Sequence, residues 1–334
     1  MSSPHPTPIS IAMAPLRGVT VFGFREVFSK HFGGVDSAVA PFIPTVIGER
    51  IKPALLKDVV KLQQGAIRVI PQLIGKDPAQ LTAMIRALQD LGHEEVNLNV
   101  GCPWKFVVKK GRGSGLMVDE DNFKRMLDAG CTALPKGFSI KVRLGIRGTD
   151  VLAKRIDLIN AYPLREIIVH PRTAQQMYEG KVHLDAFAEV CDAFKMPVTY
   201  NGDIYTVDDF LYLRKRFPNL RRFMIGRGLV CNPMLAEKII MQNVECRNNN
   251  AETMERLRKF YEDYYRHVKE ELFGPASILG RMKEFWGYFH ESFCDGEMLL
   301  RKIQRCKTFE EYERFVAEGF ERTTVAQSIR SRLV

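Results

Sequence analysis

Eight short apolar segments, each followed by a turn and an amphipathic stretch, constrain the fold of this chain more than any other feature. Several are almost continuously apolar, as expected for parallel strands buried on both faces. The predicted strands are Ile9–Leu16, Ser37–Phe42, Arg68–Ile74, Glu95–Cys102, Phe138–Leu144, Glu166–His170, Pro197–Asn201 and Arg221–Ile225. The clearest helices between them are predicted at Pro78–Leu91, Asp119–Ala129, Leu184–Phe194 and Thr206–Phe217.

Eight consecutive units of this kind, each a strand and then a helix, predict an α/β fold of the (β/α)₈ TIM-barrel type. A doubly wound open sheet is the competing fold. Its glycine-rich fingerprint for a dinucleotide is absent after the first predicted strand, so the barrel is favoured.

The sequence changes character beyond Asn232-Pro233. From Met234 to Val334 no convincing strand is found, and apolar residues recur at helical spacing. Breaks at Asn248–Asn250 and at Gly274-Pro275 separate the predicted helices. We therefore predict two domains, a barrel at residues 1–240 and a small all-α bundle of about four helices at residues 241–334.

The charge balance is basic, with 49 Lys and Arg against 39 Asp and Glu, for a net charge of +10. From Leu235 to the end, 17 basic and 17 acidic residues cancel, so the excess lies in the first 234 residues. Such an excess is equally compatible with contact to a nucleic acid and with a solvated basic face.

The seven cysteines are scattered and include no Cys-x-x-Cys pair. This spacing argues against a disulfide framework and against a zinc or iron–sulfur site, so we expect no metal and a reducing cytoplasm. No apolar run approaches a membrane span, and the start of the chain lacks the features of a signal peptide. A cytoplasmic protein without membrane contact is therefore expected.

Polar residues cluster at the carboxyl ends of the predicted strands, which is where a barrel places its functional residues. Buried polar groups need partners, so this many on one rim predict a polar ligand. The clusters are Pro15, Leu16 and Arg17; Gln72; Asn99 and Cys102; Lys141 and Arg143; His170, Arg172 and Thr173; Asn201, Gly202 and Asp203; and Gly226 and Arg227.

The glycine-bearing loops after the last two strands are typical of a phosphate site. Glycines allow amide N–H groups to approach a phosphate, and Arg227 adds a cation. The side chains of Gln72, Asn99 and Lys141 suit a flat heterocycle with imide edges, such as a flavin ring. A lysine near the N1–C2 carbonyl would stabilise the reduced, anionic ring. One phosphate site and no dinucleotide fingerprint favour FMN over FAD or NAD.

The segment from Val96 to Ser114 resembles the signature of the tRNA-dihydrouridine synthases, with Asn-Leu-Asn-Val-Gly-Cys-Pro at residues 97–103 and Gly113-Ser114 at the family's spacing. Further similar pieces follow in order through the barrel: Ala14-Pro15, Ile140–Gly145, His170–Thr173, Asn201–Asp203 and Gly226–Gly228. The stretch Gly280–Trp286 resembles the helical domain of the bacterial branch. Arg17 departs from the small or acidic residue often found there.

The resemblance implies an enzyme that reduces the C5–C6 double bond of D-loop uridines in tRNA, with NADPH as reductant. Hydride would pass from FMN N5 to C6 of uracil, and Cys102 would protonate C5. The implied FMN site comprises Pro15, Leu16, Arg17, Gln72, Lys141, His170, Asn201, Gly202, Asp203, Gly226 and Arg227.

The same resemblance implies an RNA site. Asn99 would hold a flipped-out uracil, Arg143 or the pair Arg172-Thr173 would orient the rings, and the cations of the loop after Cys102 would contact phosphates. Those cations are Lys109, Lys110 and Arg112. The tail favours the branch that modifies position 16, and we expect a monomer with no obligate protein partner.

Two alternatives remain open at the level of the sequence. One is an FMN barrel that acts on a small molecule, in the manner of dihydroorotate dehydrogenase; the basic excess and the added helices argue against it. The other is an RNA-binding protein without a flavin, which would have no reason to combine Lys141, His170 and the phosphate loops.

Overall fold

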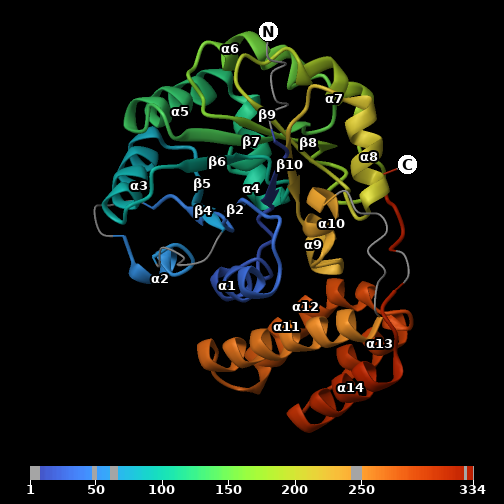
Figure 1. Ribbon diagram of the computed structural model, residues 1–334. Helices are drawn as coiled ribbons and strands as arrows, with labels where there is room; N and C mark the ends of the chain where they lie inside the picture. Colours follow the sequence, from blue (N-terminus) through green and yellow to red (C-terminus); the bar gives the residue numbers. More distant parts are fainter. Residues whose placement is uncertain (1–7, 47–50, 61–66, 242–249, 327–328, 334) are drawn as a thin grey trace.

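The structure is a computed structural model that describes residues 8–46, 51–60, 67–241, 250–326 and 329–333 (Figure 1). Ten short strands form one sheet in which every strand pairing is parallel. The strands are β1 (Ser10–Met13), β2 (Ser37–Val39), β3 (Ile43–Pro44), β4 (Arg68–Ile70), β5 (Gln72–Ile74), β6 (Val96–Val100), β7 (Phe138–Gly145), β8 (Ile167–Thr173), β9 (Val198–Asn201) and β10 (Arg222–Ile225).

Ten strands stand in place of the eight predicted ones for two reasons. The predicted strand Arg68–Ile74 is interrupted once, and β3 follows just beyond the predicted end of another strand at Phe42. Residues 40–42 separate β2 from β3, and Pro71, which has no amide N–H to donate, separates β4 from β5. β1 pairs with β10, β2 pairs with β4, and β3 pairs with β5. Because β4 and β5 are two parts of one interrupted strand, these pairings close the sheet on itself. The predicted (β/α)₈ barrel is confirmed.

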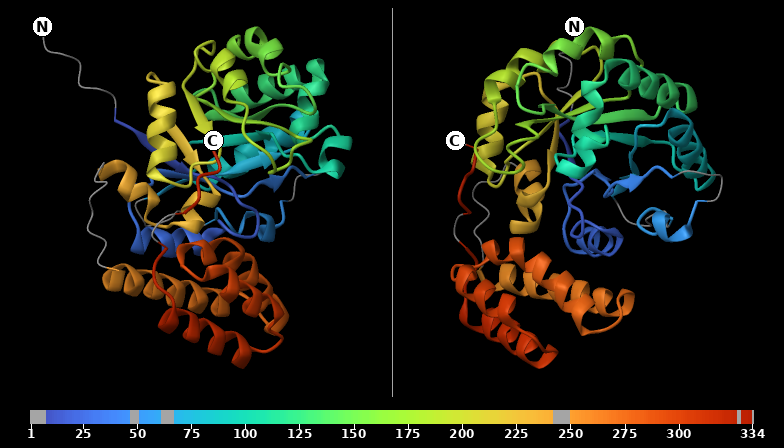
Figure 2. Two further views of the ribbon diagram at one scale, coloured as in Figure 1. Left: turned by 90° about the vertical axis from the view of Figure 1, so that its right-hand side faces the viewer. Right: turned by 180° about the vertical axis from the view of Figure 1, so that it is seen from behind.

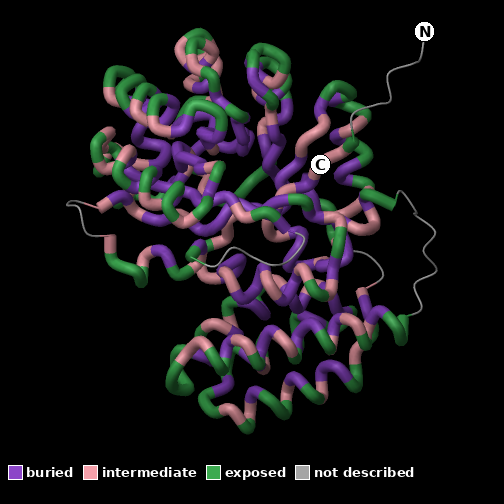
Figure 3. Tube along the Cα trace, turned by 60° about the vertical axis from the view of Figure 1, so that its left-hand side comes forward, coloured by how far each residue is buried: buried purple, intermediate pink, exposed green. Residues whose placement is uncertain are grey.

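Helices cover the outside of this barrel, and their buried sides face inward (Figure 3). Several begin at the polar caps that the sequence provides; Asp77 caps α3, and Thr206 and Asp209 form a capping box on α8. The helices of this part are α1 (Phe22–His31), α2 (Pro53–Leu56), α3 (Pro78–Asp90), α4 (Lys105–Lys109), α5 (Glu120–Ala133), α6 (Ile156–Asn160), α7 (Leu184–Cys191), α8 (Val207–Arg216), α9 (Arg227–Cys231) and α10 (Leu235–Met241), with short 3₁₀ turns at Gly113–Val118 and Ala153–Arg155.

The C-terminal region is helical, as predicted, and lies beside the barrel (Figure 2). Its helices are α11 (Asn250–Glu271), α12 (Pro275–Phe289), α13 (Gly296–Arg305) and α14 (Phe309–Arg322), with a 3₁₀ turn at His290–Ser292. Trp286 of α12 is fully buried, and its Nε1 donates to the hydroxyl of Tyr312 over 3.0 Å.

Packing joins the two regions. Phe260 of α11 packs edge-on against Phe24 and Phe28 of α1, at centroid distances of 5.9 and 6.3 Å, and α12 packs on α9. Arg332, near the end of the chain, donates to Tyr205 of the barrel and to Glu291 of the helical region. The division at 240/241 stays a prediction, because residues 242–249, including most of the predicted break at Asn248–Asn250, lie outside the described residues.

Within the described ranges, no helix combines the length and the apolar character needed to cross a membrane.

Candidate active site

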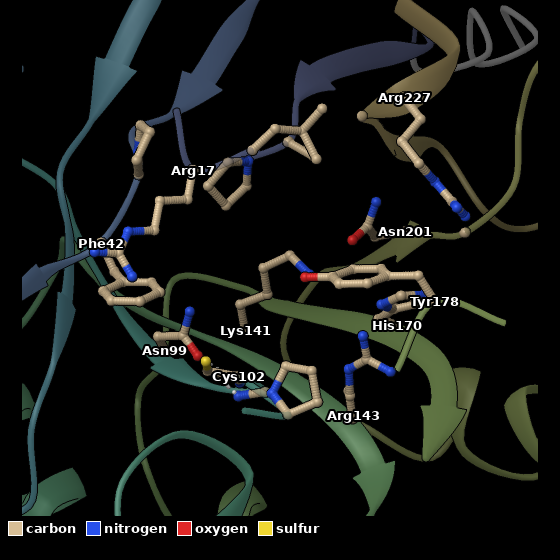
Figure 4. A pocket seen from close by; sticks show the side chains of 18 of the residues that line it. Arg17, Phe42, Asn99, Cys102, Lys141, Arg143, His170, Tyr178, Asn201 and Arg227 are labelled. Carbon is tan, nitrogen blue, oxygen red and sulfur yellow. Dashed lines mark hydrogen bonds between the residues drawn. The ribbon is translucent and has the colours of Figure 1, made fainter. Parts of the chain in front are cut away.

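A cavity lies at the carboxyl ends of the barrel strands (Figure 4). It brings together side chains predicted to lie there from seven separate strand ends. Fourteen of the predicted site residues line it: Pro15, Leu16, Arg17, Gln72, Asn99, Cys102, Lys141, Arg143, His170, Asn201, Gly202, Asp203, Gly226 and Arg227. The parallel barrel explains this convergence, since all its strands end at the same rim.

The charge of the cavity is strongly positive. Four cationic side chains line it, and Asp203 is the one carboxylate among the described lining residues. Asp203 is already bound to Arg227, whose Nη2 lies 2.6 Å from its Oδ1, and to Arg172. The uncompensated cations are Arg17, Lys141 and Arg143, so the cavity suits a ligand that carries negative charge.

Among the described lining residues, Lys141 most clearly lacks a hydrogen-bond or ion-pair partner. Its Nζ has no hydrogen bond or ion pair within the described part of the chain. Burial, and secondarily the positive charge of Arg143, lowers its pKa from 10.5 to about 7. An acceptor or anion in the cavity would stabilise the charged ammonium, which makes Lys141 a suitable ligand for an electron-rich ring edge.

His170 is held as a neutral ring. Burial lowers its pKa well below 6.5, and the charges of Arg143, Lys141, Arg172 and Arg227 act in the same direction. Its Nε2 lies 3.2 Å from Nη1 of Arg172. Because a guanidinium only donates, Nε2 accepts this bond and Nδ1 carries the proton. His170 therefore offers one neutral N–H donor.

Arg172 and Thr173 do not line the cavity, contrary to the prediction that they orient a bound ring. Arg172 is buried beside it and binds Asp203 and the carbonyl oxygens of Glu179 and Gly180. The carbonyl oxygen of Thr173 accepts from Nη1 of Arg143 over 2.8 Å. Both residues thus hold lining residues in place from behind the cavity wall.

Cys102 reaches the cavity on the loop after β6, and Figure 4 shows its sulfur at the wall beside Asn99. Cys102 as a residue is 6% exposed. Burial raises the pKa of its thiol above the ordinary 9.0, despite the opposing effects of an amide at Trp104 and of the cations Arg143 and Arg17. The side chain is therefore a protonated thiol at neutral pH.

A buried chain of amide side chains fixes the position of Cys102. Oδ1 of Asn99 accepts from the backbone amides of Gly101 and Cys102 over 3.1 and 2.8 Å. Nδ2 of Asn99 donates to Gln72, and Gln72 in turn donates to Asn97. A role of Asn99 in holding a substrate stays a prediction; its bonds in the structure orient the loop that carries the thiol.

Several lining residues escaped the sequence analysis. The exposed ring of Tyr178 lies between Arg143 and Arg227, at 5.2 and 5.8 Å from their guanidinium carbons. Tyr205 lies 5.7 Å from that of Arg227, and Phe42 lies 6.0 Å from that of Arg17. Phe42 is the last residue of a predicted strand, which was its only signal. Tyr178 lies in a turn in which Met177 has a φ of 52°.

The three loop cations predicted to contact phosphate do not line the cavity. Lys109 ends the short helix α4, and Lys110 and Arg112 follow it. The two lysines are exposed and Arg112 is half-buried. They lie on the loop outside the cavity wall, so a role toward a large ligand at the mouth stays a prediction.

The family model described as dihydrouridine synthase matches residues 12–324. A tRNA-dihydrouridine(16) synthase of Pseudomonas putida is 28% identical over 306 residues, which cover 89% of this chain and 93% of that protein. A protein of the same name from Pseudomonas syringae pv. tomato is 32% identical over 242 residues, covering 69% and 74%.

Among solved structures, morphinone reductase is similar in fold. Its TM-score is 0.50 at 11% sequence identity, with 70% of this chain and 86% of that chain covered. At this identity the likeness supports the barrel alone.

Proposed function

This chain belongs to the dihydrouridine synthase family, and we propose that it is an FMN-dependent oxidoreductase that reduces the C5–C6 double bond of a uridine in tRNA. The observation that carries the proposal is the cavity itself, where a buried, protonated Cys102 and an unpartnered Lys141 line the same space. A small-molecule flavin barrel is disfavoured because the family match runs through the helical region as well.

The residues present fit FMN. Gly228 allows the two loops at the proposed phosphate site to pack closely, since a Cβ there would lie 2.0 Å from the carbonyl oxygen of Ile204. Arg227 lies at these loops and Asp203 fixes its guanidinium. Lys141 and the neutral ring of His170 supply donors for a flavin ring, and Gln72 retains one amide hydrogen after its bond to Asn97.

Bound at this site, the flavin would supply hydride to C6 of the uracil. Cys102 then has the properties of the general acid for C5, because its thiol lines the cavity and holds its proton at neutral pH. Asn99 keeps the thiol loop in place through two backbone amides. Lys141 and Arg143 would stabilise negative charge that develops in the cavity.

A uridine within folded tRNA cannot enter such a cavity while it is stacked, so it must be flipped out. We propose position 16 as the target, since the relatives compared above carry that position in their names. We also propose NADPH as the reductant, a monomeric state and a cytoplasmic location.

The direct test is to incubate the purified protein with NADPH and an unmodified tRNA transcript, and to map dihydrouridine by mass spectrometry. One D-loop uridine should gain two hydrogen atoms, and the protein should carry about one FMN per chain. Protein that is colourless and cannot be reconstituted with FMN would contradict the proposal.

Arg227→Ala tests the phosphate site separately. The change should weaken FMN binding by about 10- to 100-fold, because a hydrogen bond to a charged group contributes roughly 1.5–3 kcal/mol. Riboflavin, which has no phosphate, serves as the matched control and should bind wild type and variant alike. Titration of apoprotein by flavin fluorescence gives both constants, and an equal loss for both ligands would place the phosphate elsewhere.

A further inference from the structure

Two large aromatic side chains are exposed directly beside the thiol loop. Trp104 is 56% exposed and Phe106 is 81% exposed. Exposed aromatic rings are few in the described residues. Two of them, Trp104 and Tyr178, line the cavity, and Phe106 lies two residues from Trp104 in the sequence. Exposure of such apolar surface is unfavourable in water, so rings gathered at a cavity mouth indicate a contact surface.

The segment that carries these rings is well fixed. The carbonyl oxygen of Trp104 accepts from the amides of Val107 and Val108 over 2.8 and 2.9 Å. A Cβ on Gly115 would lie 2.4 Å from the carbonyl oxygen of Val108, so helix α4 rests directly on the following turn. The rings are therefore presented on a preorganised support, which reduces the entropy lost when a ligand stacks on them.

Lysines lie close to the two rings along the chain. Lys105, Lys109 and Lys110 belong to the same segment and are exposed, and none of them forms a salt bridge to a carboxylate in the ranges that the structure describes. Aromatic faces for bases, with lysines beside them for phosphates, are the combination used to hold single-stranded nucleic acid. The exposed lysines complement the phosphates of RNA, and the aromatic faces next to them suit its bases.

We propose that Trp104 is a base-stacking residue, which holds a nucleotide adjacent to the uridine that enters the cavity, with Phe106 as a second apolar contact. This inference rests on the proposed function and adds the element that keeps the tRNA open at the cavity mouth. A base that has lost its stacking neighbour to the cavity exposes a ring face, and Trp104 lies where it can cover that face.

Trp104 also supplies its own probe, because the chain has two tryptophans and the other, Trp286, is fully buried. Tryptophan fluorescence of the holoprotein is followed without NADPH as an unmodified tRNA transcript is added, with correction for absorbance. Stacking should quench the emission with the same Kd that filter binding gives. Trp104→Phe should abolish the quench and keep Kd within about threefold, because phenylalanine also stacks.

Trp104→Ala should weaken tRNA binding by about 5- to 100-fold, and raise KM for tRNA more than it lowers kcat. Tyr212→Ala, which removes an exposed aromatic ring from α8, is the control and should change neither constant.

Unchanged tRNA affinity in Trp104→Ala, in an enzyme whose wild type forms dihydrouridine, overturns this inference and leaves the proposed function intact. A Trp104-dependent self-association without quenching by RNA also overturns it. A wild type that binds FMN and forms no dihydrouridine overturns the proposed function first. Should Trp104→Ala fail to fold, the quench measured in wild type and lost in Trp104→Phe decides the matter.

Discussion

Replacement of Cys102 by alanine is expected to lower the rate of dihydrouridine formation by about 10²- to 10⁴-fold, the usual contribution of a positioned general acid. The thiol lines the cavity and is held by the Asn99 bridge to its backbone. Flavin content and oxidation of NADPH should persist, because neither requires a proton at C5 of uracil. The measurement is single-turnover formation of dihydrouridine from pre-reduced enzyme.

Cys131→Ala is the matched control for this change. Cys131 is also a buried free thiol, but it lies on α5 and outside the cavity. Its loss should leave the rate of dihydrouridine formation unchanged. If Cys102→Ala retained the wild-type rate, another group would have to protonate C5, and the central role of this thiol would be refuted.

The pH dependence follows from the direction of the Cys102 pKa shift. The acid form is the active one, so the rate should fall as the pH rises through the pKa of the thiol. Burial raises this pKa above 9.0, so the fall belongs above pH 9 and not near neutrality. The residual activity of Cys102→Ala should lack this alkaline decline, whereas Cys131→Ala should show it.

The sequence predicted the barrel because the spacing of apolar residues indicates strands and helices. It predicted most of the cavity because the lining residues lie at the ends of those strands. Apolar runs define parallel strands, and every strand of a barrel delivers its carboxyl end to one rim. Gln72 and Lys141 therefore line the same cavity, although 69 positions separate them. This prediction did not require knowledge of which side chains are in contact.

The site predictions failed for residues whose position or burial depends on a loop. The sixth predicted strand ended at His170, but β8 continues to Thr173. Arg172 therefore lies within the strand and beneath the loop at Glu179–Gly180, and its guanidinium is used internally. Tyr178 was missed for the converse reason, since it belongs to an irregular turn that no periodicity describes and reaches the cavity from there.

Lys141→Met is expected to have opposite effects on the two states of the protein. Dihydrouridine formation should fall by about 10²- to 10³-fold, the usual loss when one preorganised donor to a developing negative charge is removed. Apoprotein should become more stable, because methionine fills similar volume without a buried charge. Function and stability thus make contrary demands at this position.

The stability gain should depend on pH in a defined direction. The pKa of Lys141 is about 7 in the folded protein and 10.5 in its ordinary state, so the unfolded chain binds the extra proton between these values. The free energy of unfolding of wild-type apoprotein should therefore rise with pH across this window, at about 1.4 kcal/mol per pH unit from this group. The advantage of Lys141→Met is largest below pH 7 and shrinks toward pH 10.

Urea unfolding of both apoproteins at pH 6 and pH 9 measures this difference. Lys136→Met, which neutralises an exposed lysine just before β7, is the control and should show no comparable gain at either pH. Addition of FMN should reverse the order, since a bound anionic ligand compensates the ammonium in wild type and lacks this cation in the variant. A Lys141→Met apoprotein less stable than wild type at pH 6 would mean that the ammonium already has a partner, and the cavity would lose its strongest indication of a flavin.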